Sequence, residues 1–409
     1  MNYKIITGGD KIMRVVIFTE VLSPYVCGIS SYVEVLKKGL EDLSHQVLIV
    51  TSSLHTKKPV FKDGILRCPA KKSSNKFGYE CKKIEDSKVF DFIYKFKPDV
   101  FHIHTDTKIG YMGLFIADKM NRPVVFTIHD FFMDRFASDK SNMIWRIRTY
   151  FEKRHFRDML DNSDVITSSC ERAKEFAAKA DRNVDITVIP SNTDKIRFDY
   201  QGTPPQTIDK MREKLHLSRK ATVAVFAGNL TVEKNIEFIL GAFAKYIDRS
   251  DNIQLLIVGD GSETEYLKSV CKQFGINDRV RFSGEVAHSI MPEIYASCDM
   301  YVCSSDDSLM SMSVVEAISC GLPVLIKKDK EKYVYDMIND GVNGFVYTTQ
   351  TDFIDKIKKL ASFNSEQKKS LKNLVRRSYN DIQNYHMARY TVKSYEQALK
   401  KKSSNNIGH

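Results

Sequence analysis

The chain has 409 residues, more than one ordinary compact core holds, so we expect about two domains. Hydrophobic residues make up 43% of it and charged residues 28%, which excludes a mainly disordered or fibrous protein. The formal net charge is +11 and the pI is near 9.0, which favours anionic partners such as nucleotides, acidic lipid surfaces or nucleic acid.

The cysteines and the N-terminus indicate a reducing compartment. The 8 cysteines form no Cys-x-x-Cys pair and no zinc-finger spacing with histidines, so we interpret them as small buried residues. No run approaches the ~18 apolar residues of a membrane span, and the first residues lack a signal-peptide core. We expect a cytoplasmic protein that can lie peripherally at the inner face of the cell membrane, with residues 1–12 as an N-terminal extension.

From Met13 onward, short Val/Ile/Phe-rich runs alternate with stretches of helical period, which is typical of a parallel sheet covered by helices. In the first half this pattern predicts a helix over 28–43 and strands over 14–18, 46–52, 99–104, 123–129, 164–169 and 186–190. We expect these elements to form one Rossmann-like domain over residues 13–198.

Residues 199–210 break both periods with two prolines and a glycine, and we interpret them as a linker. A second alternating series follows, with helices over 235–247 and 291–298 and strands over 221–228, 253–260, 280–284, 300–305, 323–327 and 344–347. This predicts a second Rossmann-like domain over 211–375 and a cleft between the domains. A C-terminal helix and tail over 376–409 is expected to pack back on the first domain.

Two stretches of the first domain are rich in basic residues. One runs from Lys57 to Lys88 and includes Lys71, Lys72, Lys82 and Lys83. The other, residues 143–157, interleaves aromatic and apolar side chains with basic ones and includes Trp145, Arg146 and Arg148. At helical spacing it is either a basic amphipathic helix for an anionic membrane surface or a core helix with a solvated face.

Catalytic motifs of hydrolases and phosphate-loop enzymes are absent from the sequence, which lacks Gly-x-Ser-x-Gly, His-Glu-x-x-His and Gly-x-x-x-x-Gly-Lys-Ser/Thr. The candidates that remain are loops after strands, where an open parallel sheet binds ligands. Residues 304–326 are the most informative, because a strand there leads into a Ser-rich loop and a helix. The helix start, around Ser311 to Val315, would offer N–H groups and a positive dipole end to a phosphate or a sugar hydroxyl.

Glu316 has two interpretations. We expect it within the first turn of that helix, where its carboxylate could accept hydrogen bonds from a ligand. Ser313 and Glu316 also have the Ser-x-x-Glu spacing of a capping box, in which the glutamate only closes the helix start.

An ordered set of motifs runs along the chain. In the first half it includes residues 23–52, with Cys27 and Ser44 in place of usual glycines, the Thr-x-His segment 101–130, and 186–198, with Asn192 in a glycine place. In the second half it includes FAGNLTVEKNIEFIL, IVGDGSETEYL, RFSGEV and VVEAISCGLPV. In this order the motifs resemble glycosyltransferase family 4, whose members are retaining sugar-nucleotide transferases with the two-domain GT-B fold. The order makes the resemblance specific, and it extends from Met13 to about Lys400.

The resemblance implies an acceptor-binding first domain and a donor-binding second domain. Lys234 matches the lysine that neutralises the donor diphosphate, Glu316 the glutamate that binds the ribose hydroxyls, and His129 the histidine that faces the transferred sugar; outside that context His129 would be an ordinary strand-end histidine. Further donor contacts are implied at Gly28, Ile29, Gly259, Gly284, Met310, Ser311, Met312 and Ser313.

Two positions depart from the family pattern. Asn229 stands where the family has an arginine, so one positive charge beside the leaving diphosphate is missing. Ser308 stands where the family has the first glutamate of its Glu-x7-Glu pair. Asp307 is one residue away, and we take it as the candidate carboxylate for the sugar.

The resemblance implies transfer of a hexose from a nucleoside diphosphate sugar, most simply a UDP-sugar, to a membrane lipid or a surface glycan. The acceptor hydroxyl would attack from the face that the diphosphate leaves, without a protein nucleophile. Because Asp-x-Asp is absent, we expect metal-independent transfer with no cofactor. Asn229 and Ser308 motivate the alternative, a non-catalytic GT-B scaffold that binds a partner transferase or a glycan. We expect no nucleic-acid partner, because the chain has no recognisable module for one.

Overall fold

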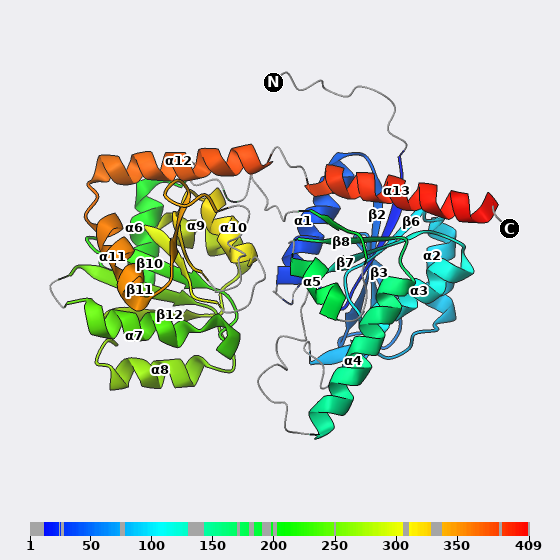
Figure 1. Cartoon of the computed structure of the whole chain (residues 1–409), viewed down its shortest axis with the longest axis horizontal. Coiled ribbons are helices and arrows are strands. Elements are labelled where there is room, and N and C mark those ends of the chain that lie inside the picture. Colours follow the sequence, from blue (N-terminus) through cyan, green and yellow to red (C-terminus); the bar gives the residue numbers. More distant parts are fainter. Residues whose placement is uncertain are drawn as a thin grey trace, which may run out of the picture. The chain divides into compact units, whose positions relative to one another are not determined.

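The computed structural model describes residues 12–23, 25, 28–73, 78–129, 143–169, 172–179, 184–189, 198, 203–248, 251–305, 311–328, 338–383 and 387–407. The side chains of 143–149, 151–152, 172, 179, 380–383 and 405–407 lie outside the description. The chain divides into two compact units: the first comprises Met1–Tyr25, Val33–Ile189 and Met387–His409, and the second Val26–Tyr32 and Pro190–His386. Figure 1 labels the elements of both.

The first unit is built on a sheet with the strand order β3-β4-β2-β1-β6-β7-β8-β9, and β5 pairs with β4. The pairs are parallel except those of β4 with β3 and β5. The strands are β1 (Arg14–Thr19), β2 (Gln46–Ser53), β3 (Val60–Lys62), β4 (Ile65–Lys72), β5 (Tyr79–Cys81), β6 (Val100–Ile103), β7 (Val124–Ile128), β8 (Val165–Ser168) and β9 (Ile186–Val188).

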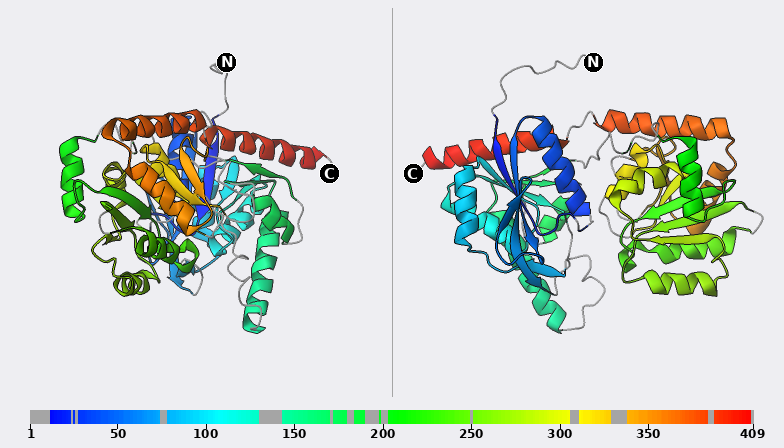
Figure 2. Two further views of the ribbon diagram at one scale, coloured as in Figure 1. Left: turned by 60° about the vertical axis from the view of Figure 1, so that its left-hand side comes forward. Right: turned by 180° about the vertical axis from the view of Figure 1, so that it is seen from behind.

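The first unit's helices are α1 (Gly28–Asp42) from Val33 onward, α2 (Ser87–Phe96), α3 (Lys108–Lys119), α4 (Met143–Asp161), α5 (Arg172–Lys179) and α13 (Met387–Ile407). The last of these, red in Figure 1 and Figure 2, packs against β6, β7 and β8. This confirms the expected return of the C-terminal helix to the first domain. The preceding helix, α12, is described as far as Gln383 and belongs to the second unit, which extends past residue 375, the end proposed for the second domain.

The second unit has a parallel sheet of order β12-β11-β10-β13-β14-β15. Its strands are β10 (Thr222–Ala227), β11 (Ile253–Val258), β12 (Val280–Gly284), β13 (Met300–Cys303), β14 (Val324–Lys327) and β15 (Gly344–Tyr347). Its helical segments are α6 (Pro205–Lys214), η3 (Val232–Lys234), α7 (Ile236–Tyr246), α8 (Thr264–Gln273), η4 (His288–Ile290), α9 (Met291–Ala296), α10 (Met312–Ser319), α11 (Gln350–Ala361) and α12 (Ser365–Gln383).

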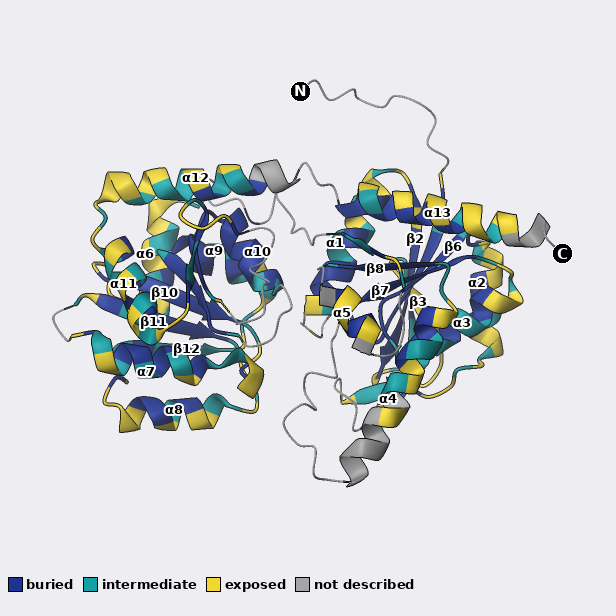
Figure 3. Ribbon diagram, viewed as in Figure 1, coloured by how far each residue is buried: buried dark blue, intermediate teal, exposed yellow. Residues whose placement is uncertain are grey.

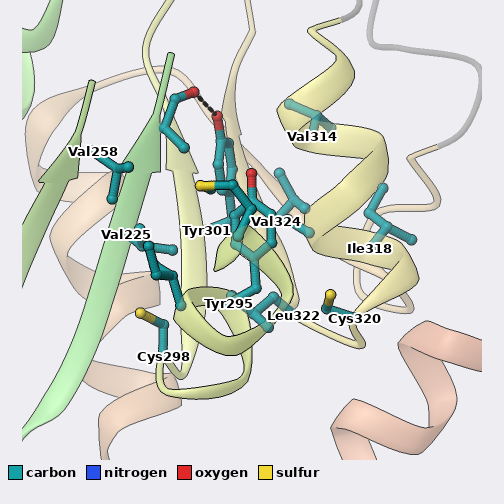
Figure 4. Close-up of a cluster of buried hydrophobic side chains, with 14 of the residues drawn as sticks. Val225, Val258, Tyr295, Cys298, Tyr301, Val314, Ile318, Cys320, Leu322 and Val324 are labelled. Atoms are coloured by element: carbon teal, nitrogen blue, oxygen red, sulfur yellow. Dashed lines mark hydrogen bonds between the residues drawn. The ribbon is translucent and has the colours of Figure 1, made fainter. Parts of the chain in front are cut away.

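The central strands of both sheets are buried on both faces, which explains their continuous apolar runs. Figure 3 shows them as buried between helices with exposed outer sides. On one face of the second sheet, Val225 and Val258 pack in the same cluster as Val314 and Ile318 of α10 (Figure 4). The position of α10 is therefore set by apolar packing against the sheet.

Each predicted strand is present within one or two residues. Strands β3 to β5 were not predicted; β3 and β5 are only three residues long and give no clear period. The predicted linker 199–210 is wrong in its second part, since α6 begins at Pro205. A proline suits the first helical position because its fixed φ matches the helix and its missing N–H would have no partner there.

The expectation that the cysteines are small buried residues is confirmed for those within the described ranges, namely Cys68, Cys81, Cys271, Cys298, Cys303 and Cys320, which are all buried. Cys27, Cys170, Asn192 and the proposed extension up to residue 11 lie outside the described residues.

Candidate functional site

Two glycine-containing loops lie against each other at the carboxyl ends of β10 and β11. The backbone N–H of Leu230 donates to the carbonyl oxygen of Asp260 at 2.9 Å. A Cβ at Gly259 would lie 2.0 Å from the carbonyl oxygen of Gly228, and a Cβ at Gly261 would lie 2.3 Å from that of Leu230. Gly259 also has a φ of +128°. The Gly-x-Gly motif is therefore required by the close approach of these two loops.

Gly284 joins this edge of the sheet from β12. Its φ is +69°, and its carbonyl oxygen accepts a hydrogen bond from the N–H of Gly259 at 2.9 Å. Two glycines predicted as donor contacts are thus brought together, and the ends of three neighbouring strands form one backbone surface.

Glu316 is a buried carboxylate in the second turn of α10, not in the first turn as predicted, because the helix begins at Met312. Its Oε1 lies 2.6 Å from Nε2 of His288, and its Oε2 accepts a hydrogen bond from the Tyr295 hydroxyl at 3.2 Å. The side chain of His288 is 22% exposed and that of Glu316 is 5% exposed. The carboxylate is held by two side chains from η4 and α9, which rules out the capping-box interpretation.

Hydroxyl groups connect the start of α10 to the end of β10. The Ser311 and Ser313 hydroxyl oxygens are 2.5 Å apart, and Ser313 Oγ lies 2.9 Å from the Tyr301 hydroxyl. Tyr301 also donates to the carbonyl oxygen of Ala227 at 3.0 Å. Met312, the first helical residue, is buried. Asp307, Ser308 and Met310 lie outside the described residues.

Lys234 lies at the end of η3, and its backbone is attached to the end of β13. The Ser304 hydroxyl donates to the carbonyl oxygens of Lys234 and Asn235, at 3.0 and 2.7 Å. Asn229 is an exposed residue of the loop after β10, and its Oδ1 would be 2.6 Å from a Cβ at Gly261. The fold thus places Asn229 and Lys234 at the same sheet edge as the glycine loops.

In the first unit, His129 follows β7 and its Nε2 lies 2.7 Å from Nδ1 of His104, which follows β6. Next to this pair, His102 places its ring nitrogens 2.8 Å from the Tyr395 hydroxyl and 2.6 Å from the Thr127 hydroxyl. Burial lowers the pKa of His102 to about 3 and that of His104 well below its usual value. Sequence reasoning found His129 but not its partner; the signal was the His-x-His spacing, which puts both side chains on one face of the strand.

A second buried acid was also missed. Glu20 follows β1, and its carboxylate accepts hydrogen bonds from the Thr107 hydroxyl and, at 3.1 Å, from the Cys81 N–H. Burial raises its pKa. Glu20 holds together the loops at the carboxyl end of the first sheet.

The other predicted contacts are at the surface or outside the description. Gly28 and Ile29 open α1, and Gly28 is exposed. The candidate lysines Lys71, Lys72, Lys82 and Lys83 are all exposed. Nζ of Lys71 lies 3.2 Å from Oε1 of Glu80. The segment with Trp145, Arg146 and Arg148 is helical in α4, but these side chains lie outside the described ones.

Among the described residues, no group of three or more His, Cys, Asp and Glu side chains could hold a metal ion, and metal-independent transfer stays a prediction. Within the same ranges, no helix has the length and apolar character needed to cross a bilayer.

Comparisons with known proteins agree with this architecture. Residues 26–194 match the family described as Glycosyltransferase Family 4, and residues 207–380 match Glycosyl transferases group 1. The chain is 26% identical to alpha-monoglucosyldiacylglycerol synthase of Streptococcus pneumoniae, over 84% of this chain and 77% of that protein. It is 24% identical to the synthase of the same name from Acholeplasma laidlawii, over 84% and 86%.

Solved structures share the fold at low sequence identity. Anabaena HepE in complex with UDP-glucose superposes with a TM-score of 0.69 at 18% identity, over 96% of this chain and 100% of that one. Sucrose-phosphate synthase from Thermosynechococcus elongatus superposes with a TM-score of 0.73 at 14% identity, over 95% and 99%.

Two parallel α/β units, glycine loops at the carboxyl ends of the second sheet and a C-terminal helix on the first unit define a glycosyltransferase of the GT-B class. The two family matches together cover most of the chain. The protein belongs to glycosyltransferase family 4 and is a hexosyltransferase, which favours the enzyme over the non-catalytic scaffold.

Proposed function

We propose that this protein transfers a hexose, with retention of configuration, from a UDP-sugar to a membrane lipid acceptor. The observation that carries the proposal is the buried carboxylate of Glu316 on α10, which the side chains of His288 and Tyr295 hold in place. Hydrogen bonds through Tyr301 connect the start of this helix to the end of β10, where the first glycine-containing loop begins. The lipid acceptor is supported by the two diacylglycerol-glycolipid synthases to which the chain is similar. The UDP-sugar is supported by the HepE complex with UDP-glucose.

In this proposal the donor lies along the carboxyl edge of the second sheet. Glu316 accepts hydrogen bonds from the ribose hydroxyls, and Lys234 neutralises the diphosphate as it leaves. The acceptor hydroxyl oxygen forms a bond to the sugar carbon on the face from which the diphosphate departs. The bond from that carbon to the phosphate oxygen breaks, and the hydroxyl proton passes to this oxygen. Catalysis then depends on positioning and on stabilisation of the leaving group.

Asn229 leaves the proposed diphosphate site with one positive charge fewer than the family pattern has. An amide there supplies no positive charge, and removal of one preorganised donor from such a site costs about 3 kcal/mol. Restoring the cation with Asn229→Arg should therefore raise the turnover number if the diphosphate lies beside this loop. Asn229→Gln, which adds length without charge, is the matched control.

An exposed apolar surface on the first unit supports an acceptor in a bilayer. Phe61 of β3 is 50% exposed, and its ring centroid lies 4.8 Å from that of Phe92 on α2. Lys57 and Lys58 precede β3 in the sequence and Lys62 is its last residue, and all three lysines are exposed. Aromatic side chains rimmed by lysines are the composition that binds anionic lipid surfaces.

A donor and acceptor screen tests the function. The full chain is incubated with UDP-glucose, UDP-galactose, UDP-N-acetylglucosamine and the corresponding GDP- and ADP-sugars, with diacylglycerol in mixed micelles or without acceptor. We expect one UDP-sugar to raise the melting temperature and to release UDP faster when diacylglycerol is present. If no nucleotide sugar stabilises the folded protein, the proposed donor site is wrong. If the donor binds but turns over only with a soluble glycan, the lipid acceptor is wrong.

Vesicle flotation tests the surface. We expect the full chain to bind vesicles of phosphatidylcholine with phosphatidylglycerol, and Phe61→Ser to weaken this binding. Tyr266→Ser removes a similarly exposed aromatic side chain, 47% exposed, from α8 of the second unit and should leave binding unchanged. Equal binding of the wild type and Phe61→Ser would exclude this surface.

A further inference from the structure

His104 and His129 form a close imidazole pair at the ends of neighbouring strands. Nδ1 of His104 lies 2.7 Å from Nε2 of His129, and the ring planes are inclined by only 24° with centroids 5.0 Å apart. The His104 side chain is buried, and its backbone N–H donates to the carbonyl oxygen of Phe18 on β1 at 2.9 Å. His104 is thus a fixed group of the sheet, while His129 belongs to the loop after β7.

We propose that His104 is a positioning residue that fixes the ring orientation and the tautomer of His129. The inference rests on the proposed function together with the family resemblance, in which His129 matches the histidine that faces the transferred sugar. Because Nε2 of His129 is engaged with His104, a sugar hydroxyl that hydrogen-bonds to the ring must do so through Nδ1. Without His104 the ring could turn about its χ2 bond and present either nitrogen.

The neutral state of His104 couples the tautomers of the two rings. Burial and the neighbouring rings of His102 and His129 lower its pKa well below the usual value, so His104 carries a single ring proton at neutral pH. If that proton is on Nδ1, His104 donates to His129, and His129 offers an N–H at Nδ1. If it is on Nε2, His129 donates its own Nε2–H, and Nδ1 becomes an acceptor. A sugar hydroxyl can meet either arrangement, but each allows a single neutral tautomer of His129.

Buried polar groups hold His102, whose ring packs against that of His104. The ring centroids of His102 and His104 are 4.1 Å apart, and both nitrogens of His102 are hydrogen-bonded, to Tyr395 and to Thr127. The hydroxyl oxygen of Thr127 is also hydrogen-bonded to the hydroxyl oxygen of Thr167, at 2.6 Å. This network runs from α13 through β6, β7 and β8 and restricts movement of the rings, because each broken bond would leave a buried polar group unpaired.

Nitrogen NMR of the full chain labelled with 15N-histidine tests the proposal, with the His129 ring signals assigned by their loss in His129→Gln. His104→Asn keeps an amide near the position of Nδ1 and should preserve a single His129 tautomer. His104→Phe removes the partner and should give averaged ring shifts of both tautomers. With donor and acceptor, we expect turnover within about 3-fold of wild type for His104→Asn and about 10- to 100-fold lower for His104→Phe, the size of loss caused by a misplaced contact.

Thr127→Val is the control for a purely structural effect. It removes a hydroxyl from the same buried network, so it should lower the melting temperature while leaving the His129 tautomer unchanged. An unchanged His129 spectrum in folded His104→Phe would overturn the proposal. If the tautomer changes as expected but His129→Gln transfers sugar as fast as wild type, then His104 positions His129 and the assigned role of His129 in transfer is wrong.

Discussion

Glu316→Gln is the most direct test of the candidate donor site. The substitution preserves the shape of the side chain and removes its charge. In the wild type the carboxylate accepts hydrogen bonds from His288 at 2.6 Å and from Tyr295 at 3.2 Å. In the proposed function it also accepts hydrogen bonds from the ribose hydroxyls. An amide has one acceptor oxygen in place of two, so it cannot serve these donors equally well.

The expected loss follows from the strength of hydrogen bonds to charged groups, about 1.5–3 kcal/mol each. At about 1.4 kcal/mol per factor of ten, the affinity for UDP should fall about 10- to 100-fold. The unliganded protein should lose only about 1–2 kcal/mol of unfolding free energy, because the amide can still bond to one neighbour. Nucleotide binding therefore changes much more than folding does.

Isothermal titration of UDP into the full chain and thermal unfolding without ligand measure the two effects separately. Tyr295→Phe is the matched control, because it removes one neighbour of the carboxylate and keeps the charge, so UDP affinity should change less than about 3-fold. A folded Glu316→Gln variant with wild-type affinity for UDP would refute the placement of the ribose at this carboxylate. Should Glu316→Gln not fold, Glu316→Asp, which keeps the charge but draws it back by one methylene, should still weaken UDP binding.

Three further predictions concern stability. Ser44 has a φ of +68°, where a non-glycine residue is strained by about 1–2 kcal/mol. Ser44→Gly should therefore raise the free energy of unfolding, measured by chemical denaturation, by about 0.5–1 kcal/mol after the added flexibility of the unfolded chain is subtracted. Ser362→Gly, at a φ of −73°, is the control and should lower it, and a loss of stability in both variants would contradict this reasoning. Burial would raise the pKa of Asp299, but nearby lysines, a backbone N–H and Arg212 lower it overall, so its contribution to stability is present above the pKa of an unfolded aspartate and is lost as the pH falls through the folded-state value. Asp299→Asn should cost about 3 kcal/mol at pH 7 and much less in acid, and a cost independent of pH would exclude the ionic interpretation. Burial raises the pKa of Glu20, so ionisation of its carboxyl group destabilises the fold as the pH rises from the ordinary pKa of 4.5 upward. The melting temperature of Glu20→Gln relative to that of the wild type should therefore increase between pH 5 and pH 8. A constant difference would show that Glu20 is not protonated more easily in the folded state.

The order of the elements could be predicted because it depends on local patterns. Apolar runs such as 222–227 and 253–258 are continuous because both faces of those strands are buried, and this composition is visible along the chain. The short strands β3 and β5 escaped because three residues carry no period. Helix α6 was not predicted, and its first residues were assigned to a linker, because Pro204 and Pro205 suit a linker and a helix start equally well.

Partners of the functional side chains could not be read from the sequence in the same way. Glu316 has an acceptable local partner at Ser313, yet its carboxylate contacts His288, 28 residues earlier. His129 and His104 are 25 residues apart and meet because β6 and β7 are neighbours in a parallel sheet. Such contacts depend on which strands pair and in what register, and no local period records that choice.

The sequence by itself determined the family, the two α/β units and the loops that carry the candidate site, because glycines and apolar periods act over a few residues. Tertiary structure alone decided which groups hold the Glu316 carboxylate and which nitrogen of His129 is engaged. The physical reason is that a buried charge or ring nitrogen must find a hydrogen-bond partner wherever packing places one, and packing brings together residues that are distant along the chain.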